Sequence, residues 1–501
     1  MQQLKDIESL SEIDEFTQND CRLFSAFQYI MANINLQGIS RMLNNAKSKG
    51  VKPLDLFRFV FVMPFVDLDN VHQLMRSGLN KTAMCRKDTL YRFLNNPAIP
   101  WRKIHHSFFV QLVKLVNKYR ETVDSSANPT TPPCFILDDT LFPKTGKAIE
   151  GIGKVYDHIT HTHKLGIKAL VAGLWDGTMF LPFDLSLHHE PRKDQSRGMK
   201  RKDIDKQFTK SRNVLSPSYS RLKELGLSKI EVAKRMLHDF LKLRVGCRYV
   251  LGDSWFTCHE ILQAVENLSN RFNRDLDYIG LIKMDRKIAP SGKKQQSRIR
   301  NILAELNRKK KPTRCKKYKC YYQRLKGTYK GIEATFFFVR MSRSSNWKCM
   351  ICTDTSLSLT KAMELYSIRW TIEVFFKDAK QNLNLGKCQS NDFDAHIATN
   401  TLTCMNYMAI AVQKRFNDYE TIGHMFKEWK NQLLHQNMIQ KLWELLSKLL
   451  SSIFSALGID WDDLMRNLIS EQNLFEELYS VMHSVCGYPQ TKSLKNCKCE
   501  T

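Results

Sequence analysis

The stretch from Tyr366 to Lys380, YSIRWTIEVFFKDAK, constrains the chain most. Four polar side chains recur in it at offsets of 0, 3, 7 and 14: Tyr366, Arg369, Glu373 and Lys380. On one α-helix these offsets fall within about 60° of one another. The intervening residues are mostly apolar, so the pattern predicts a helix buried on nearly every side. A solvated polar stripe is the alternative, but so narrow a stripe favours a site that needs these four groups.

Acidic residues follow two apolar runs that read as strands. The run CFILDDT, residues 134–140, ends in Asp138 and Asp139, and CRYVLGDSWF, residues 247–256, places Asp253 after its apolar part. Carboxylates at strand ends point into the crevice where open α/β sheets bind ligands. Together with the glutamate of the polar stripe they would repel one another unless cations lay between them. Oxygen ligands favour Mg²⁺ or Mn²⁺, and two such ions make a site for phosphodiester chemistry.

The charge of the chain predicts a polyanionic partner. The net charge is +27, and residues 283–330 contain 18 Lys and Arg against 2 acids, while residues 192–223 contain 11 against 3. These two windows hold 24 of the 27 net charges, which suits a phosphate backbone. We expect no signal peptide, because the N-terminus is acidic and lacks an apolar core, and no membrane span, because the longest apolar run, at 54–66, is too short.

Two further groups of residues have the chemistry of metal ligands. Cys349 and Cys352 have zinc-like CxxC spacing and follow another cysteine pair, Cys315 and Cys320. However, WKCMICTD reads as a strand, on which residues three apart face opposite sides. The second group is histidine-rich, and loop or DNA-backbone histidines are the alternative to a metal cluster there: His158, His161, His163, His188 and His189.

Changes in local composition along the chain predict its domain organisation. Residues 1–130 read as a helical, DNA-binding domain, in which the helix within 80–97 is a recognition helix or an ordinary packed one. A Ser-, Thr- and Pro-rich linker precedes strands, and Asp176-Gly177 predicts a hairpin within 164–187. Residues 131–282 with 356–395 would form an α/β core, 283–355 a basic β-rich insertion, and 396–501 a helical C-terminal region.

The spacing Tyr-x2-Arg-x3-Glu-x6-Lys resembles the YREK signature of bacterial cut-and-paste DDE transposases. ILDDT and VLGDSWF look like the segments that carry the first two acids of that group, so the resemblance covers roughly residues 134–390. It implies an RNase H-like mixed-sheet catalytic core, interrupted by a mostly β insertion before the glutamate helix and flanked by helical N- and C-terminal domains.

The resemblance also implies roles for individual residues. Asp138, Asp253 and Glu373 would be the catalytic acids that hold two Mg²⁺ or Mn²⁺ ions; Asp139 is the alternative to Asp138, which fits the Asp-x-Thr pattern of the family. Four residues would bind DNA, the last of them by holding a flipped base from the insertion: Tyr366, Arg369, Lys380 and Trp347. Trp255, beside the second acid, reads as a core residue.

We therefore expect a transposase of an insertion-sequence element. It would cleave double-stranded DNA at the terminal repeats, join the 3′-OH to target DNA, and act as a homodimer whose C-terminal helices make the contact. A bacterial cytoplasmic, nucleoid-associated location follows. Another RNase H-like endonuclease, and a non-catalytic DNA-binding protein descended from a transposase, are the alternatives.

Overall fold

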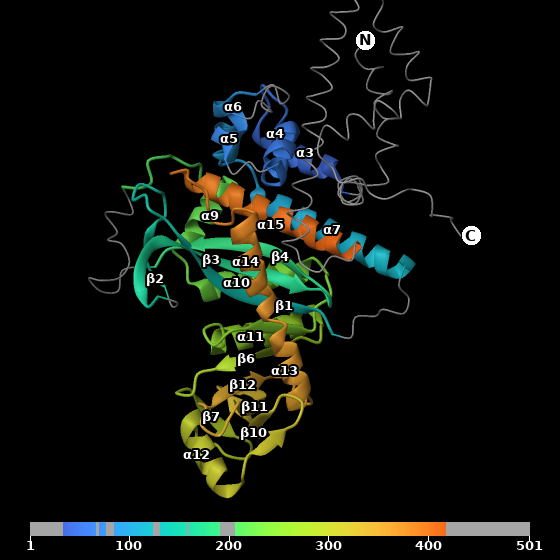
Figure 1. Ribbon diagram of the computed structural model, residues 1–501, viewed down its shortest axis with the longest axis vertical. Helices are drawn as coiled ribbons and strands as arrows, with labels where there is room; N and C mark the ends of the chain where they lie inside the picture. The colour runs from blue at the N-terminus through green and yellow to red at the C-terminus, as the bar shows by residue number, and fades with distance from the viewer. Residues whose placement is uncertain are drawn as a thin grey trace, which may run out of the picture. The chain divides into compact units, whose positions relative to one another are not determined.

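The computed structural model describes residues 34–66, 70–76, 85–123, 131–157, 160–190 and 206–416. Within this part, the N-terminal region is helical, as predicted, and helices α5 and α6 pack against each other. Its helices are α3 (Leu36–Ala46), α4 (Pro53–Val62), the 3-10 helix Met63–Val66, α5 (Val71–Arg76), α6 (Lys87–Leu94) and α7 (Trp101–Val123). The long helix α7 packs against the sheet edge at β4 and against α15 (Phe393–Phe416), as Figure 1 shows.

The central region is built on a mixed sheet. Strand β1 pairs antiparallel with β3, which pairs antiparallel with β4, while β5 and β6 continue the sheet parallel to β1. The strands of this part are β1 (Cys134–Pro143), β2 (Gly153–Asp157), β3 (Thr162–Trp175), β4 (Phe180–His188), β5 (Tyr249–Gly252) and β6 (Asp277–Ile282). The order β4-β3-β1-β5-β6, with helices on both faces, confirms the predicted RNase H-like α/β core.

Local sequence signals explain several of these elements. The predicted hairpin joins β3 to β4 at Asp176, whose carboxylate accepts hydrogen bonds from the backbone N–H groups of Thr178 and Met179 at 2.9 Å each. Helix α10 (Lys229–Lys242) begins with a capping box, in which Ser228 and Glu231 exchange side-chain and backbone bonds. Both signals fix the boundaries of elements that carry the core.

Helices cover the two faces of the sheet. Phe240 of α10 contacts Phe135 of β1, and α10 also packs against α11 (His259–Phe272). Phe375 of α14 (Trp370–Asn382) contacts Phe180 of β4, and α14 lies across the sheet in Figure 1. Helices α9 (Pro217–Leu225) and α15 also pack on β4. The core thus lies between these helices and the strands.

The insertion continues the same sheet. Strand β12 pairs antiparallel with β6 through Cys349–Ile282 to Cys352–Ile279, so the insertion has no separate sheet of its own on this path. Its elements and the helix that follows are β7 (Lys287–Pro290), β8 (Ser297–Arg298), α12 (Ile299–Lys309), β9 (Thr313–Cys315), β10 (Cys320–Tyr329), β11 (Ile332–Arg340), β12 (Lys348–Cys352) and α13 (Leu359–Ser367). The described strands form one 12-stranded sheet, ending in β10-β7-β8.

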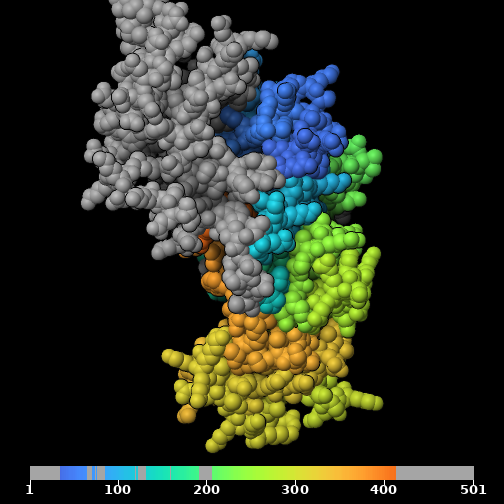
Figure 2. Space-filling view, turned by 90° about the vertical axis from the view of Figure 1, so that its right-hand side faces the viewer, coloured from blue at the N-terminus to red at the C-terminus, as the bar shows by residue number. Residues whose placement is uncertain are grey.

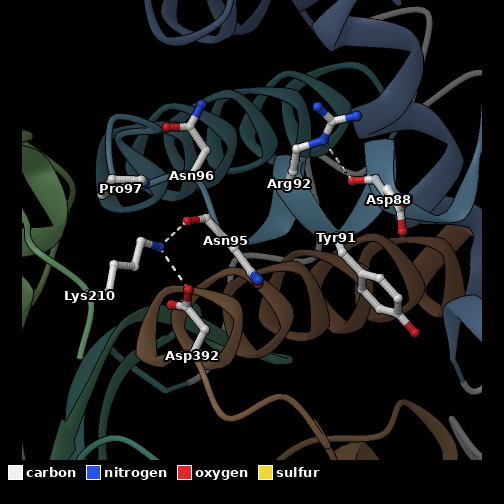
Figure 3. A pocket seen from close by; sticks show the side chains of 8 residues that line it. All are labelled: Asp88, Tyr91, Arg92, Asn95, Asn96, Pro97, Lys210 and Asp392. Carbon is white, nitrogen blue, oxygen red and sulfur yellow. Dashed lines mark hydrogen bonds and ion pairs between the residues drawn. The ribbon is translucent and has the colours of Figure 1, made fainter. Parts of the chain in front are cut away.

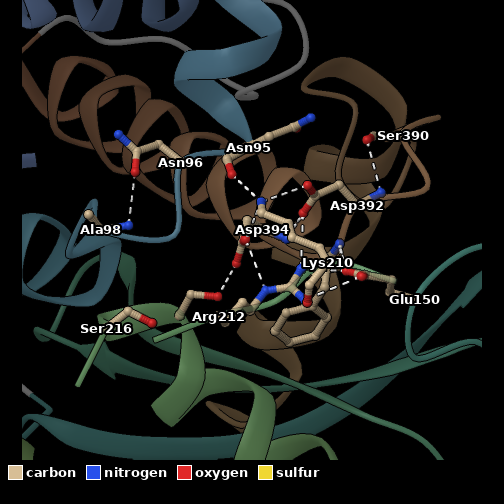
Figure 4. Close-up of polar contacts among 12 residues, drawn as sticks. Asn95, Asn96, Ala98, Glu150, Lys210, Arg212, Ser216, Ser390, Asp392 and Asp394 are labelled. Carbon is tan, nitrogen blue, oxygen red and sulfur yellow. Dashed lines mark hydrogen bonds and ion pairs between the residues drawn. The ribbon is translucent and has the colours of Figure 1, made fainter. Parts of the chain in front are cut away.

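A buried cluster of charges joins the N-terminal helices to the core (Figure 4). Arg212 binds Glu150 at 2.5 Å, Asp394 at 3.1 Å and Asp392 at 3.2 Å. Lys210 binds the same two aspartates at 2.7 Å each and donates to the carbonyl of Asn95, the residue that caps α6. Beside the cluster lies a pocket lined by residues 88, 91, 92, 95–97, 210 and 392 (Figure 3). The end of α6 is therefore tied to the start of α15.

This cluster corrects one expectation from the charge pattern. Arg212 and Arg221 belong to the first basic window, yet they are only 8% and 6% exposed. Arg221 donates to Asp184 at 3.4 Å, an aspartate 1% exposed on β4. These arginines neutralise buried carboxylates, so they are not available to bind a DNA backbone. Residues 192–205 of the window lie outside the described part.

None of the described helices combines the length and apolarity needed to cross a membrane. The predicted linker lies mostly outside the described residues, as do residues 417–501 of the expected C-terminal helical region. Helix α6 covers the later part of the proposed recognition helix and buries Leu90, Phe93 and Leu94. That α6 contacts DNA bases stays a prediction.

Candidate active site

The first two acids lie side by side on parallel strands. The β1–β5 register pairs Leu137 with Gly252, so Asp138, within β1, and Asp253, the residue after β5, come next along the two chains. Burial and the neighbouring Asp253 raise the pKa of the Asp138 carboxyl to about 7, although Arg369 opposes the shift. The carboxylate of Asp253 accepts hydrogen bonds from the backbone N–H groups of Trp255 at 2.8 Å and Phe256 at 3.0 Å.

Strand β1 does not end at the acids, contrary to the interpretation from sequence. It continues antiparallel to β3 up to Pro143, which pairs with Gly166, and only its parallel pairing with β5 stops at Leu137. Asp138 is therefore a mid-strand residue. The β-branched and aromatic residues after it explain the continuation, because such side chains favour strands.

Neighbouring residues of a strand point to opposite faces, and this separates the two candidates for the first acid. Asp138 faces α14, where Arg369 donates to it at 2.8 Å. Asp139 forms an ion pair with Lys229, the first residue of α10. Of these two candidates, Asp138 is thus the one directed toward the helix that holds Glu373.

The prediction of one continuous helix over 366–380 is wrong, because two helices share this segment. Tyr366 belongs to the last turn of α13, Arg369 caps α14, and only Glu373 and Lys380 lie within α14. Between the helices the backbone makes tighter bonds, from Arg369 N–H to Tyr366 O at 3.1 Å and from Thr371 N–H to Ile368 O at 2.9 Å. These i→i+3 bonds tighten the turn as in a 3-10 helix.

The burial of this segment also differs from the prediction. Ile372, Phe375 and Phe376 are buried, but Trp370 is 61% exposed and Val374 is 40% exposed. The helix is therefore amphipathic rather than apolar on nearly every side. Its solvent-facing tryptophan stands directly beside Arg369.

Arg369 joins the acids of the two elements. One nitrogen of its guanidinium lies 2.8 Å from Asp138, and the other lies 2.6 Å from Glu373. Burial and the acids Asp253 and Asp138 raise the pKa of the Tyr366 hydroxyl to about 12, against the opposing effect of Arg369. The three acids, the arginine and the tyrosine thus interact within one site.

Lys380 reaches the same strand further along. Its amine donates to the Thr140 hydroxyl at 2.6 Å and to the Leu141 carbonyl at 3.1 Å, and burial lowers its pKa. Trp347 precedes β12, whose start pairs with the end of β6, and Arg340 lies 4.6 Å from its ring centroid. Trp347 is therefore at the same edge of the sheet as Asp253, but on the insertion.

The donor set fits a hard divalent cation, because Asp138, Asp253 and Glu373 offer carboxylate oxygens and little else. In the part of the chain that the structure describes, however, no group of three or more His, Cys, Asp or Glu is arranged to hold a metal ion. At the acids, Arg369 pairs with both Asp138 and Glu373. The same finding leaves the described cysteines and histidines of the two other candidate groups without a metal arrangement.

Comparison with known proteins finds a family that matches part of the chain. A family model described as DDE superfamily endonuclease matches residues 73–318, which include Asp138 and Asp253 but end before Glu373. The fold and this match support a DDE-type transposase or endonuclease. Proteins of this class act on DNA, and the nucleases among them generally use divalent metal ions. No curated protein matches the chain.

Two features of this site have no counterpart in the sequence pattern. Trp255 is 41% exposed, although its apolar surroundings in the sequence predict a core residue. Lys229 pairs with Asp139 and lies 4.3 Å from the centroid of the Trp255 ring, and sequence reasoning missed it. The lysine has no local signal, because only the fold brings the start of α10 to the acids.

Proposed function

We propose that this protein is the transposase of an insertion-sequence element, which cleaves phosphodiester bonds at the element ends and joins the freed 3′-OH to target DNA. The observation that carries the proposal is that Arg369 pairs with both Asp138 and Glu373, while Asp253 lies beside Asp138 and helps to raise its pKa. Tyr366 of the YREK pattern, on α13, interacts electrostatically with Asp253 and Asp138, and Lys380, on α14, donates to Thr140, two residues after Asp138. A nuclease alone would need the acids but not this whole set.

The three acids would hold two Mg²⁺ or Mn²⁺ ions, which when bound activate water and stabilise the charge on the attacked phosphate. The protein's own side chains position the DNA. Arg369 offers a forked, charged contact to a phosphate, Lys380 offers a point charge, and Tyr366 offers a ring face and a hydroxyl. Trp347 would hold a flipped base from the insertion side.

The insertion supports DNA as the substrate. All 18 of its Lys and Arg residues between 283 and 330 are exposed, in contrast to the buried arginines of the first window. Figure 2 shows the insertion residues gathered in one contiguous yellow-to-orange region. A surface of this charge would bind the phosphate backbone without regard to sequence and release it in high salt.

Synapsis of two DNA ends calls for at least two copies of the chain, so we propose a homodimer whose contact lies in the C-terminal region. The bacterial cytoplasm, in association with the nucleoid, is the proposed location. The proposed dimer contact depends on residues beyond 416, and the proposed location depends on the resemblance to transposases. The proposed chemistry of the site requires neither.

The test is cleavage of a labelled duplex that carries the terminal repeats of the element, in Mg²⁺, by wild type and by Glu373→Gln. The substitution removes the charge and nearly preserves the shape. Cleavage at the repeats by the wild type, abolished in the variant while DNA binding persists, supports the proposal. Cleavage without preference for the repeats would indicate an endonuclease, and tight binding without cleavage in Mg²⁺ or Mn²⁺ would indicate a non-catalytic DNA-binding protein.

A further inference from the structure

Trp255 presents a large aromatic face to solvent at the edge of the active site. Its side chain is 41% exposed, whereas its neighbours Phe256 and Thr257 are each 1% exposed. The exposure of a tryptophan ring leaves apolar area in water, which is unfavourable. A ligand that covers the ring would remove that cost.

The turn that carries Trp255 is rigid and starts at a proposed metal ligand. The N–H of Trp255 donates to the carboxylate of Asp253 at 2.8 Å, and the Thr257 hydroxyl donates to the Asp253 carbonyl at 2.8 Å. The Thr257 hydroxyl also lies 2.9 Å from that of Tyr278 on β6. The backbone of Trp255 is thus fixed relative to the acid.

The ring itself is held from two sides. The amine of Lys229 lies 4.3 Å from the ring centroid, and the ring of Phe256 meets it edge-on, with centroids 4.8 Å apart and planes at 80°. Lys229 is kept in place by its ion pair with Asp139. One ring face is therefore covered by a cation, and the solvent-exposed part of the ring remains for a flat partner.

We propose that Trp255 is a stacking platform for an unpaired nucleobase of the DNA, positioned by Lys229 and Asp139. The inference rests on the proposed function, because the platform lies two residues from a proposed metal ligand. A base in a duplex is already stacked on both sides, so the partner is a base exposed by fraying or extrusion near the attacked phosphate. Any base has a flat π-face, so the contact does not depend on sequence.

The experiment uses the full chain in EDTA, which prevents the proposed metal-dependent cleavage, and a 20-nucleotide oligothymidylate as the probe. Binding is measured by fluorescence anisotropy for wild type, Trp255→Ala, Trp255→Phe and the control Leu215→Ala, which truncates a side chain that is 91% exposed. We expect Trp255→Ala to weaken binding about tenfold, as the removal of one stacked base predicts. Trp255→Phe should retain most of the affinity, and the control should match the wild type.

A second readout identifies the residue directly. The same oligonucleotide with 5-iodouracil in place of thymine is irradiated in the complex, and the adducts are mapped by mass spectrometry. An adduct on Trp255 is expected in the wild type, and the peptide that contains position 255 should carry no adduct in Trp255→Ala while the melting temperature stays unchanged.

The outcomes separate the two proposals. Unaltered binding by Trp255→Ala, with adducts only on other residues, overturns the stacking platform; if the wild type still cleaves duplexes in Mg²⁺, the nuclease function stands. If the wild type neither binds the oligonucleotide nor cleaves DNA, both proposals are overturned.

Discussion

The guanidinium of Arg369 lies 2.8 Å from the carboxylate of Asp138, where the proposed catalytic acids would need a shared cation. Its second contact, to Glu373 at 2.6 Å, makes it a substitute for that cation. The single positive charge thus offsets part of the repulsion between the two carboxylates, and a metal bound between Asp138 and Glu373 would displace the arginine. A DNA phosphate that draws the guanidinium away would free both carboxylates.

We predict that Arg369→Gln makes the DNA-free protein dependent on metal. Without the arginine, Asp138 faces Asp253 and Glu373 uncompensated, so the melting temperature in EDTA should fall below that of the wild type. Mn²⁺ should restore it in the variant and change the wild type little, as measured by differential scanning fluorimetry. The control is the double variant Arg369→Gln/Glu373→Gln, in which the loss of one carboxylate charge removes part of the repulsion. Equal Mn²⁺ responses in wild type and Arg369→Gln would contradict the role.

The charge cluster around Arg212 predicts a large decrease in stability that does not arise from DNA binding. Arg212→Leu leaves Glu150 and Asp394 buried and short of their partner, which costs about 3–5 kcal/mol of unfolding free energy. Urea denaturation measures the change. The matched variant Lys210→Met should cost less, because the Lys210 side chain is 28% exposed, against 2% for that of Arg212. Equal effects of the two variants would refute this ranking.

The exposed lysines of the insertion predict a change in salt dependence. Replacing Lys309, Lys310 and Lys311 with Gln should weaken DNA binding and make the slope of log affinity against log salt shallower by about 0.9 for each phosphate that the protein no longer neutralises. The stability should change little, since all three side chains are exposed. A titration from low to high salt measures the slope. An unchanged slope would place the DNA elsewhere.

Buried histidine predicts how stability depends on pH. Burial lowers the pKa of His105 to about 3, and its ring lies 3.0 Å from the Pro182 carbonyl. The unfolded chain, with a pKa near 6.5, binds the proton first, so the free energy of unfolding falls as pH drops below about 6.5. Each pH unit should cost about 1.4 kcal/mol for this residue.

Urea denaturation of wild type and His105→Gln at pH 7 and pH 5 tests this dependence. The variant should lose less stability between the two pH values, whatever its stability at pH 7. The dependence of the wild type continues down to about pH 3, where the folded protein also binds the proton. Parallel pH profiles for the two proteins would contradict the prediction.

Sequence patterns predicted which helices and strands occur better than they predicted the residues at which these begin and end. The Asp176-Gly177 turn is a local signal that predicted a hairpin, and the structure contains it. The break before Trp370 has no such signal, since neither Gly nor Pro occurs between Tyr366 and Lys380. It separates Tyr366 from the helix of Glu373, and only the packing of α13 and α14 against different strands reveals it.

Long-range contacts account for what the sequence could not show of the site. Arg212 and the lysines at 309–311 look alike as members of basic windows, but the first is enclosed by carboxylates from distant segments. Trp255 lies next to apolar residues in the sequence, and its exposure depends on the conformation of the turn that follows β5. The proximity of Asp138 and Asp253 was predictable, because each follows an apolar run that reads as a strand, and the two runs pair in parallel in the structure.

The continuity of the sheet sets how mechanical load would pass through the molecule. Strand β12 is bonded to β6, and β6 to β5, so two strand spacings of about 4.8 Å separate the insertion from the strand of Asp253. A bent DNA that pulls on the insertion would load these backbone hydrogen bonds in shear rather than flex a linker. The insertion would then move as one rigid body with β5 and β6, and its displacement would be transmitted directly to the acids.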